Sequence, residues 1–166
     1  QQRPACQRTA PILADMSLAK STIATIGSGV MAEAMIAGLL RGKQVTPNRI
    51  IASHPRADRR SELISTYGIG TVEENASAVE KADVVVLAIK PQMLARVGRE
   101  IGSLAAALGG IDALVFTGGI GEHATAVRDA VCRAAHWLGV DPDPARSRVA
   151  VAVIPTNEEE MIARHT

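Results

Sequence analysis

The feature that most constrains the fold is a glycine-rich hexapeptide that lies between a short β-branched run and a helical pattern. Residues 27–32 are Gly-Ser-Gly-Val-Met-Ala, which fits the pattern G-x-G-x-x-G/A. The run at residues 22–26 has strand character, and apolar residues recur at helical spacing from Val30 onward. In such a strand–turn–helix unit, the first glycine permits a tight turn and the second lets the backbone approach a pyrophosphate. Ala32 allows the helix to pack closely on the sheet.

The N-terminus of the following helix would face the phosphates of a bound nucleotide, because its backbone N–H groups attract anions. The sequence therefore predicts a nucleotide-binding turn, made by Gly27, Ser28, Gly29, Val30 and Met31. The alternative is a glycine turn that only connects a strand to a helix.

Strand and helix patterns alternate along the rest of the chain. Further strands are expected at residues 49–53, 69–72, 83–89, 113–117 and 149–154, and helices at 57–67, 92–108, 122–138 and from 156. Such alternation is typical of parallel strands joined by right-handed crossovers. We predict an α/β fold: a Rossmann-like three-layer αβα domain over residues 16–166, with a mostly parallel sheet of about six strands in the order 3-2-1-4-5-6. Residues 1–15 show neither period and are expected to be a disordered leader.

The charge balance argues for a small bound molecule. The 18 Lys and Arg residues and 17 Asp and Glu residues nearly cancel, so no charge excess favours a nucleic acid or a membrane surface as partner. Apolar runs fall short of the roughly 18 residues that a membrane-spanning helix needs, so a cytoplasmic location is expected. Cys6 and Cys132 match no metal-ligand spacing and are read as free thiols. The oligomeric state stays open.

The end of the second expected strand predicts NADP(H) rather than NAD(H). NAD-binding units usually place an acidic residue there to accept the ribose hydroxyls. This chain has Ser53, His54 and Arg56, and a hydroxyl and a guanidinium can hold a 2′-phosphate. The alternative is that Arg56 belongs to a solvated basic run with Arg59 and Arg60.

The end of the fourth expected strand supplies three further candidates. Ala88, Lys90 and Pro91 would leave this strand beside the first strand, where the nicotinamide ring of a dinucleotide would lie. Alternatively, Pro91 only begins the next helix.

Residues 16–100 resemble the N-terminal part of pyrroline-5-carboxylate reductase, in IGSGVMAEAMIAGLL, ASHPRADRR and VVVLAIKPQML. That family reduces a cyclic imine to proline with NAD(P)H, and the resemblance implies cofactor binding by Gly27, Gly29, Ser53, Arg56 and Lys90. In the family a helical C-terminal domain builds the dimer and the imine site, and nothing in this chain matches that domain. We therefore assign no catalytic residues and expect the chain alone to be inactive as a proline-biosynthesis oxidoreductase.

Residues 101–166 resemble the C-terminal end of acetate kinase, in IGSLAAALGGIDALVFTGGIGEHATAVRDAVC and VAVIPTNEEEMIAR. The resemblance implies an ATP-binding turn at Gly118, Gly119, Ile120, Gly121 and Glu122, and a magnesium contact by Glu158. The alternative for Glu158 is a helix start, because Thr156 and Glu159 have the spacing of a capping box.

The two resemblances together describe a chimera-like chain, joined in the helix near residues 98–102. A natural fusion, an engineered fusion and an artefact of sequence assembly all stay open.

Overall fold

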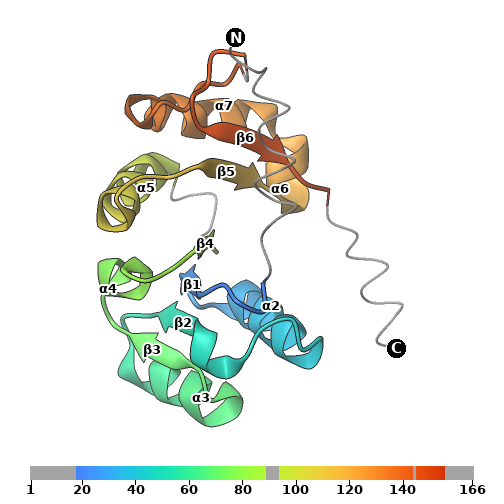
Figure 1. The fold of residues 1–166 in the computed structure, drawn as a ribbon, viewed down its shortest axis with the longest axis vertical. Coiled ribbons are helices and arrows are strands. Elements are labelled where there is room, and N and C mark those ends of the chain that lie inside the picture. The colour runs from blue at the N-terminus through green and yellow to red at the C-terminus, as the bar shows by residue number, and fades with distance from the viewer. Residues whose placement is uncertain (1–17, 89–93, 144, 156–166) are drawn as a thin grey trace. The chain divides into compact units, whose positions relative to one another are not determined.

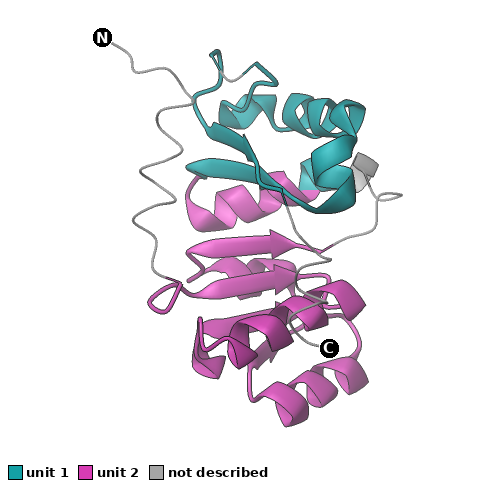
Figure 2. Ribbon diagram, turned by 90° about the vertical axis from the view of Figure 1, so that its right-hand side faces the viewer, with its two compact units in different colours: residues 1–14, 94–99, 111–166 teal, residues 15–93, 100–110 magenta. Residues whose placement is uncertain are grey.

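A computed structural model describes residues 18–88, 94–143 and 145–155 of the chain (Figure 1). The leader at residues 1–15 and the last helix, expected from residue 156, lie outside these residues. The described residues divide into two compact units (Figure 2). The first unit holds residues 18–88 and 100–110, and the second holds residues 94–99 and 111–155 without 144. The single domain expected over residues 16–166 stays a prediction.

The first unit contains a four-stranded parallel sheet of order β3-β2-β1-β4. Ile23 in β1 pairs with Ile50 on one side and with Val84 on the other. The predicted order is therefore confirmed for its first four strands. The elements from residue 23 to residue 108 are β1 (Ile23–Ile26), α2 (Val30–Arg41), the 3-10 helix η1 (Pro47–Arg49), β2 (Ile50–Ser53), α3 (Ala57–Tyr67), β3 (Gly70–Val72), α4 (Asn75–Val79), β4 (Val84–Leu87) and α5 (Leu94–Leu108).

Helices cover both faces of this sheet, because successive strand side chains point to opposite sides. On one face Ile23 and Ile50 pack with Ile36 of α2 and Leu63 of α3. On the other face Ala24 and Ile26 pack with α4 and with Leu104 of α5. The three-layer αβα arrangement is thus present in the first unit. The short helix α4 was not expected from the sequence, although its Ala78 and Val79 are fully buried.

The second unit contains a separate two-stranded parallel sheet, in which Ala113 pairs with Ala150. The prediction of one six-stranded sheet is wrong, since β5 and β4 are not hydrogen-bonded neighbours in the described part of the chain. A strand–helix alternation looks the same locally whether or not β5 joins the edge of β4, so the pattern could not decide this pairing. The elements of this unit are β5 (Ala113–Phe116), α6 (Gly118–His123), α7 (Thr125–Ala134), the 3-10 helix η3 (His136–Leu138) and β6 (Ala150–Val153).

The single helix expected over residues 122–138 is also wrong, because three short helices occupy residues 118–138. The break between the first two falls at Ala124, whose ψ of 77° interrupts the helical hydrogen-bond ladder. Alanine has the highest helix propensity of all residues, so no local signal marks this break. The third helix ends at Gly139, whose positive φ of 92° suits glycine.

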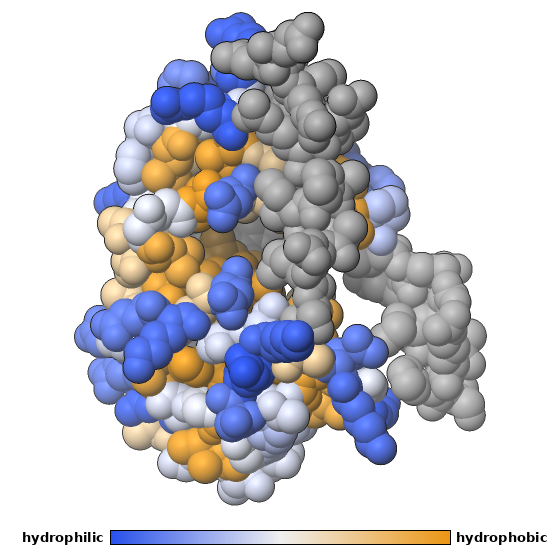
Figure 3. Space-filling model, viewed as in Figure 1, coloured by the Kyte–Doolittle hydropathy of each residue, from blue (hydrophilic) through white to orange (hydrophobic). Residues whose placement is uncertain are grey.

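The surface mixes polar and apolar residues. On the face drawn in Figure 3, hydrophilic and hydrophobic residues are interspersed. Among the described helices, none combines the length and the apolar character needed to cross a membrane.

Candidate functional site

The turn between β1 and α2 has the backbone conformation that its glycines predict. Gly27 has a φ of 83°, in the left-handed region that L side chains rarely adopt. The N–H of Gly29 donates to the carbonyl oxygen of Gly27 at 2.8 Å, which closes the turn directly after β1. Ala32 is fully buried, in agreement with its expected role in close packing of helix and sheet.

The start of α2 is open to solvent. Gly29 is the N-cap of α2 and provides no side-chain cap, and a Cβ built on it would meet no atom of the described residues within 4 Å. Val30 and Met31 are 83% and 66% exposed. The first N–H groups of a helix lack partners inside the helix, and the positive end of the helix dipole lies there. This helix start therefore fits an anion such as a pyrophosphate, which the Gly29 backbone could approach closely.

Ser28 ties the turn to the neighbouring strand. Its side chain is fully buried, and its Oγ donates to the carbonyl oxygen of Ser53 at 3.0 Å. The same hydroxyl lies 3.3 Å from Oγ1 of Thr25. The Ser28 hydroxyl is thus structural, and only its backbone is placed to face a ligand.

The three candidates after β2 differ in exposure. Ser53 is only 1% exposed, and its Oγ donates to Oδ1 of Asn75 in α4 at 2.8 Å, so this hydroxyl faces the interior. His54 accepts at Nδ1 from the backbone N–H of Arg56 at 3.2 Å. The Arg56 side chain is 66% exposed, and its Nη1 lies 3.8 Å from the equally exposed carboxylate of Asp58. Arg56 is therefore the candidate most open to a ligand.

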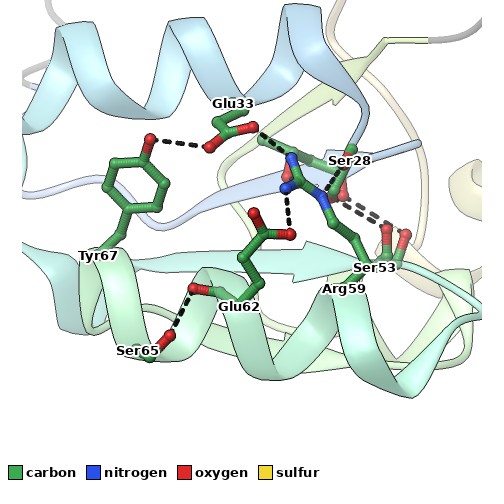
Figure 4. Close-up of polar contacts among 8 residues, drawn as sticks. Ser28, Glu33, Ser53, Arg59, Glu62, Ser65 and Tyr67 are labelled. Carbon is green, nitrogen blue, oxygen red and sulfur yellow. Dashed lines mark hydrogen bonds and ion pairs between the residues drawn. The ribbon is translucent and has the colours of Figure 1, made fainter.

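Arg59 does not belong to a solvated run. Its side chain is 11% exposed, and its guanidinium bonds to three acceptors (Figure 4). One Nη donates to Glu33 in α2, the other to Glu62 at 2.7 Å, and Nε donates to the carbonyl oxygen of Ser28 at 3.3 Å. Bonds to the two carboxylates raise the pKa of Arg59 further above its ordinary value.

Tyr67 completes this cluster from the last turn of α3. Its hydroxyl donates to Oε1 of Glu33 at 3.0 Å. The hydrogen bonds from Arg59 and Tyr67 lower the pKa of the Glu33 carboxyl. Burial, and then the contact with Glu33, raises the pKa of Tyr67.

Arg60 is also held by the protein. It donates from Nη1 to the carbonyl oxygens of His54 and Pro55, each at 2.8 Å, and its Nη2 lies 3.2 Å from Glu73. The solvated-run interpretation is therefore wrong for Arg59 and Arg60. It stays open for Arg56.

Sequence reasoning missed Glu33, Tyr67 and Asn75, and it placed Arg59 in the wrong environment. These residues meet across 22 to 34 positions of sequence. No local pattern marks such partners, because charged residues at helical spacing fit a solvated helix surface equally well.

The candidates after β4 are only partly described. The N–H of Ala88 donates to the carbonyl oxygen of Ile26 at 2.9 Å, so Ala88 lies beside the end of β1 as expected. Lys90 and Pro91 lie outside the described residues.

The second candidate site forms a short helix rather than an open turn. Gly118, Gly119, Ile120, Gly121 and Glu122 all fall in α6. A Cβ on Gly121 would lie 3.1 Å from the carbonyl carbon of Phe116, so glycine is needed there for close packing. Arg128 donates to the carbonyl oxygens of Gly121 and Glu122, each at 2.8 Å.

Metal ligands are not apparent in either unit. Glu158 lies outside the described residues, and the residues that are described contain no cluster of three or more acidic, His or Cys side chains suited to a metal ion.

A family model matches more than half of the chain. Residues 22–115 match the family described as NADP oxidoreductase, coenzyme F420-dependent.

Individual relatives cover other parts of the chain. An acetate kinase from Rhodopseudomonas palustris (strain TIE-1) is 57% identical over 42% of this chain and 21% of its own length. An acetate kinase from Halalkalibacterium halodurans is 35% identical over 84% of this chain and 39% of its own length. The chain thus spans less than half the length of either relative.

One solved structure gives a weaker match over most of the chain. The pyrroline-5-carboxylate reductase of Coxiella burnetii is 20% identical over 87% of this chain and 62% of its own, with a TM-score of 0.46.

Proposed function

Because the chain belongs to the family described as NADP oxidoreductase, coenzyme F420-dependent, over residues 22–115, we propose that its first unit binds NADP(H). The observation that carries this proposal is the open glycine turn at the start of α2, at the carboxyl end of β1. Ligands of parallel α/β sheets bind at that end of the strands.

The pyrophosphate binds at the turn, on the backbone of Gly29 and the first N–H groups of α2, at Val30 and Met31. The neighbouring Gly27 and Ser28 shape this turn. Because an acidic residue is missing from residues 51–57 at the strand end, the 2′-phosphate is accepted there, and the exposed guanidinium of Arg56 is its main ligand.

Three groups take supporting positions in this proposal. His54 lies between the strand end and Arg56. Ser53 supports the site from the interior, since its hydroxyl bonds to Asn75. Ala88, Lys90 and Pro91 border the nicotinamide, beside the end of β1.

The chemistry proposed for this unit is that of a pyrroline-5-carboxylate reductase-like oxidoreductase in proline biosynthesis. Bound NADPH supplies a hydride, which passes to the carbon of a cyclic imine. The residues of this chain bind and orient the cofactor. The imine has to be held against the nicotinamide by groups that the chain alone does not assign, so we expect turnover by the chain alone to be undetectable or very slow.

A second candidate function rests on the 57% identity to an acetate kinase. In this case residues 118–122 belong to an ATP site and Glu158 assists magnesium. The chain then joins parts of two enzymes, with the junction near residues 98–102, and sequencing the source DNA across the codons of residues 95–105 tests that junction.

Equilibrium titration of one protein sample with NADPH, NADH and ATP separates the two functions. We expect NADPH to bind most tightly and NADH more weakly. ATP binding with no binding of either dinucleotide would replace the first proposal by the second. Absence of binding by all three would reject both.

A further inference from the structure

The Ser28–Gly29 peptide unit is held at both of its polar ends. The N–H of Gly29 donates to the carbonyl oxygen of Gly27 at 2.8 Å, and the carbonyl oxygen of Ser28 accepts from Nε of Arg59 at 3.3 Å. This peptide directly precedes the open start of α2. Its orientation therefore sets the direction of the first free N–H groups of the helix.

The guanidinium that holds this peptide comes from a different helix and is itself fixed. Arg59 belongs to α3, and its other two nitrogens bond to Glu33 in α2 and to Glu62 in α3 (Figure 4). Glu33 is fixed in turn by the hydroxyl of Tyr67. With all its donors directed to protein acceptors and 11% of its side chain exposed, Arg59 has no free edge for a phosphate.

We propose that Arg59 is a positioning residue for dinucleotide binding, which holds the Ser28 carbonyl so that the turn before α2 keeps the orientation that a pyrophosphate needs. The inference rests on the proposed binding of NADP(H) and assigns Arg59 a role distinct from that of Arg56. Arg56 acts on the 2′-phosphate, which only NADP(H) carries. Arg59 acts on the pyrophosphate turn, which NADPH and NADH use alike.

The decisive variant is Arg59→Lys in the full chain. A lysine ammonium is a compact point charge without the planar fork of arginine, so it can keep an ion pair with Glu33 but cannot also reach the Ser28 carbonyl. We expect Arg59→Lys to weaken NADPH and NADH by the same factor, about tenfold, because a binding site loosened by a fraction of an ångström loses affinity. Arg59→Ala should show the same equal loss with a larger fall in thermal stability.

Tyr67→Phe is the matched control, because it also removes a hydrogen bond to Glu33 but leaves the contact between Arg59 and Ser28 intact. It should lower the melting temperature and leave both affinities unchanged. Affinities are measured by titration of cofactor fluorescence, at a temperature at which circular dichroism shows each variant to be folded.

Two results would overturn the inference, and they differ. If the unsubstituted protein binds neither NADPH nor NADH, the proposed function fails and the inference fails with it. If the unsubstituted protein binds NADPH but Arg59→Lys binds it equally well, or loses affinity for NADPH alone, only the positioning role of Arg59 is rejected.

Discussion

The hydroxyl of Ser28 donates to the carbonyl oxygen of Ser53 at 3.0 Å, and this bond joins the glycine turn after β1 to the end of β2. The two segments that carry the candidate cofactor residues are thus fixed to one another in the interior of the first unit. The turn and the strand end are 25 residues apart in sequence.

Ser28→Ala should lower the free energy of unfolding by about 1–3 kcal/mol, since it removes a buried donor and leaves its acceptor without that bond. Denaturant unfolding measures the change. The control is Ser65→Ala, because the exposed Ser65 hydroxyl bonds only within α3. Surface changes of that kind stay within about 0.5 kcal/mol, so equal effects of the two substitutions would contradict the structural role of Ser28.

Gly29→Ala should weaken cofactor binding without a loss of stability. The φ of Gly29 is −81°, which alanine adopts without strain, and its new methyl group would meet no described atom within 4 Å. In the complex the methyl group would stand where the pyrophosphate approaches, so we expect NADPH and NADH affinity to fall about tenfold or more. Gly38→Ala, later in the same helix, is the control and should change neither affinity. Unchanged NADPH affinity in Gly29→Ala would move the pyrophosphate away from this turn.

Arg56→Ala should weaken NADPH much more than NADH. A charge-assisted hydrogen bond is worth roughly 1.5–3 kcal/mol, or about 10- to 100-fold in affinity. Because Arg56 is exposed, added salt should reduce the difference. Arg41→Ala, which removes an exposed arginine from the far end of α2, should leave the ratio of the two affinities unchanged. An equal loss for both cofactors in Arg56→Ala would show that this guanidinium does not contact the 2′-phosphate.

Acid should destabilise the protein partly through Glu33. Hydrogen bonds from Arg59 and Tyr67 lower the pKa of Glu33 in the folded state. Its contribution to stability is therefore fully present above the ordinary glutamate pKa of about 4.3, and it is lost as the pH falls through the lowered pKa of the folded state. Glu33→Gln should be less stable than the unsubstituted protein at neutral pH and should lose less stability on acidification. Parallel stability curves from pH 6 to pH 3 would refute this coupling.

The 166-residue chain should form no acetyl phosphate from ATP and acetate. It spans 21% of the kinase relative to which it is 57% identical. Phosphoryl transfer depends on the positioning and charge stabilisation that many residues supply together. A coupled assay with and without protein measures the rate. Product formation above the protein-free control would show that residues 118–122 belong to a working phosphotransferase site.

Local sequence determined most of the elements of the first unit. A β-branched run followed by glycine gave β1 and its turn, because only glycine takes the φ of Gly27 without strain. Gly68 ended α3 where the sequence predicted, with a left-handed φ of 67°. The strand order up to β4 also followed from the alternation of strands and helices.

Only the tertiary structure decided which side chains of the site are free. Arg56, Arg59 and Arg60 look alike in sequence, yet Arg59 meets Glu33 and Ser28, Arg60 meets the carbonyl of His54, and Arg56 extends to solvent. Ser53 turns its hydroxyl inward to Asn75 for the same reason. The separation of β5 from β4 likewise depends on backbone hydrogen bonds between distant segments. Local propensity fixes the conformation of a few neighbouring residues, whereas these contacts depend on packing between segments far apart in the chain.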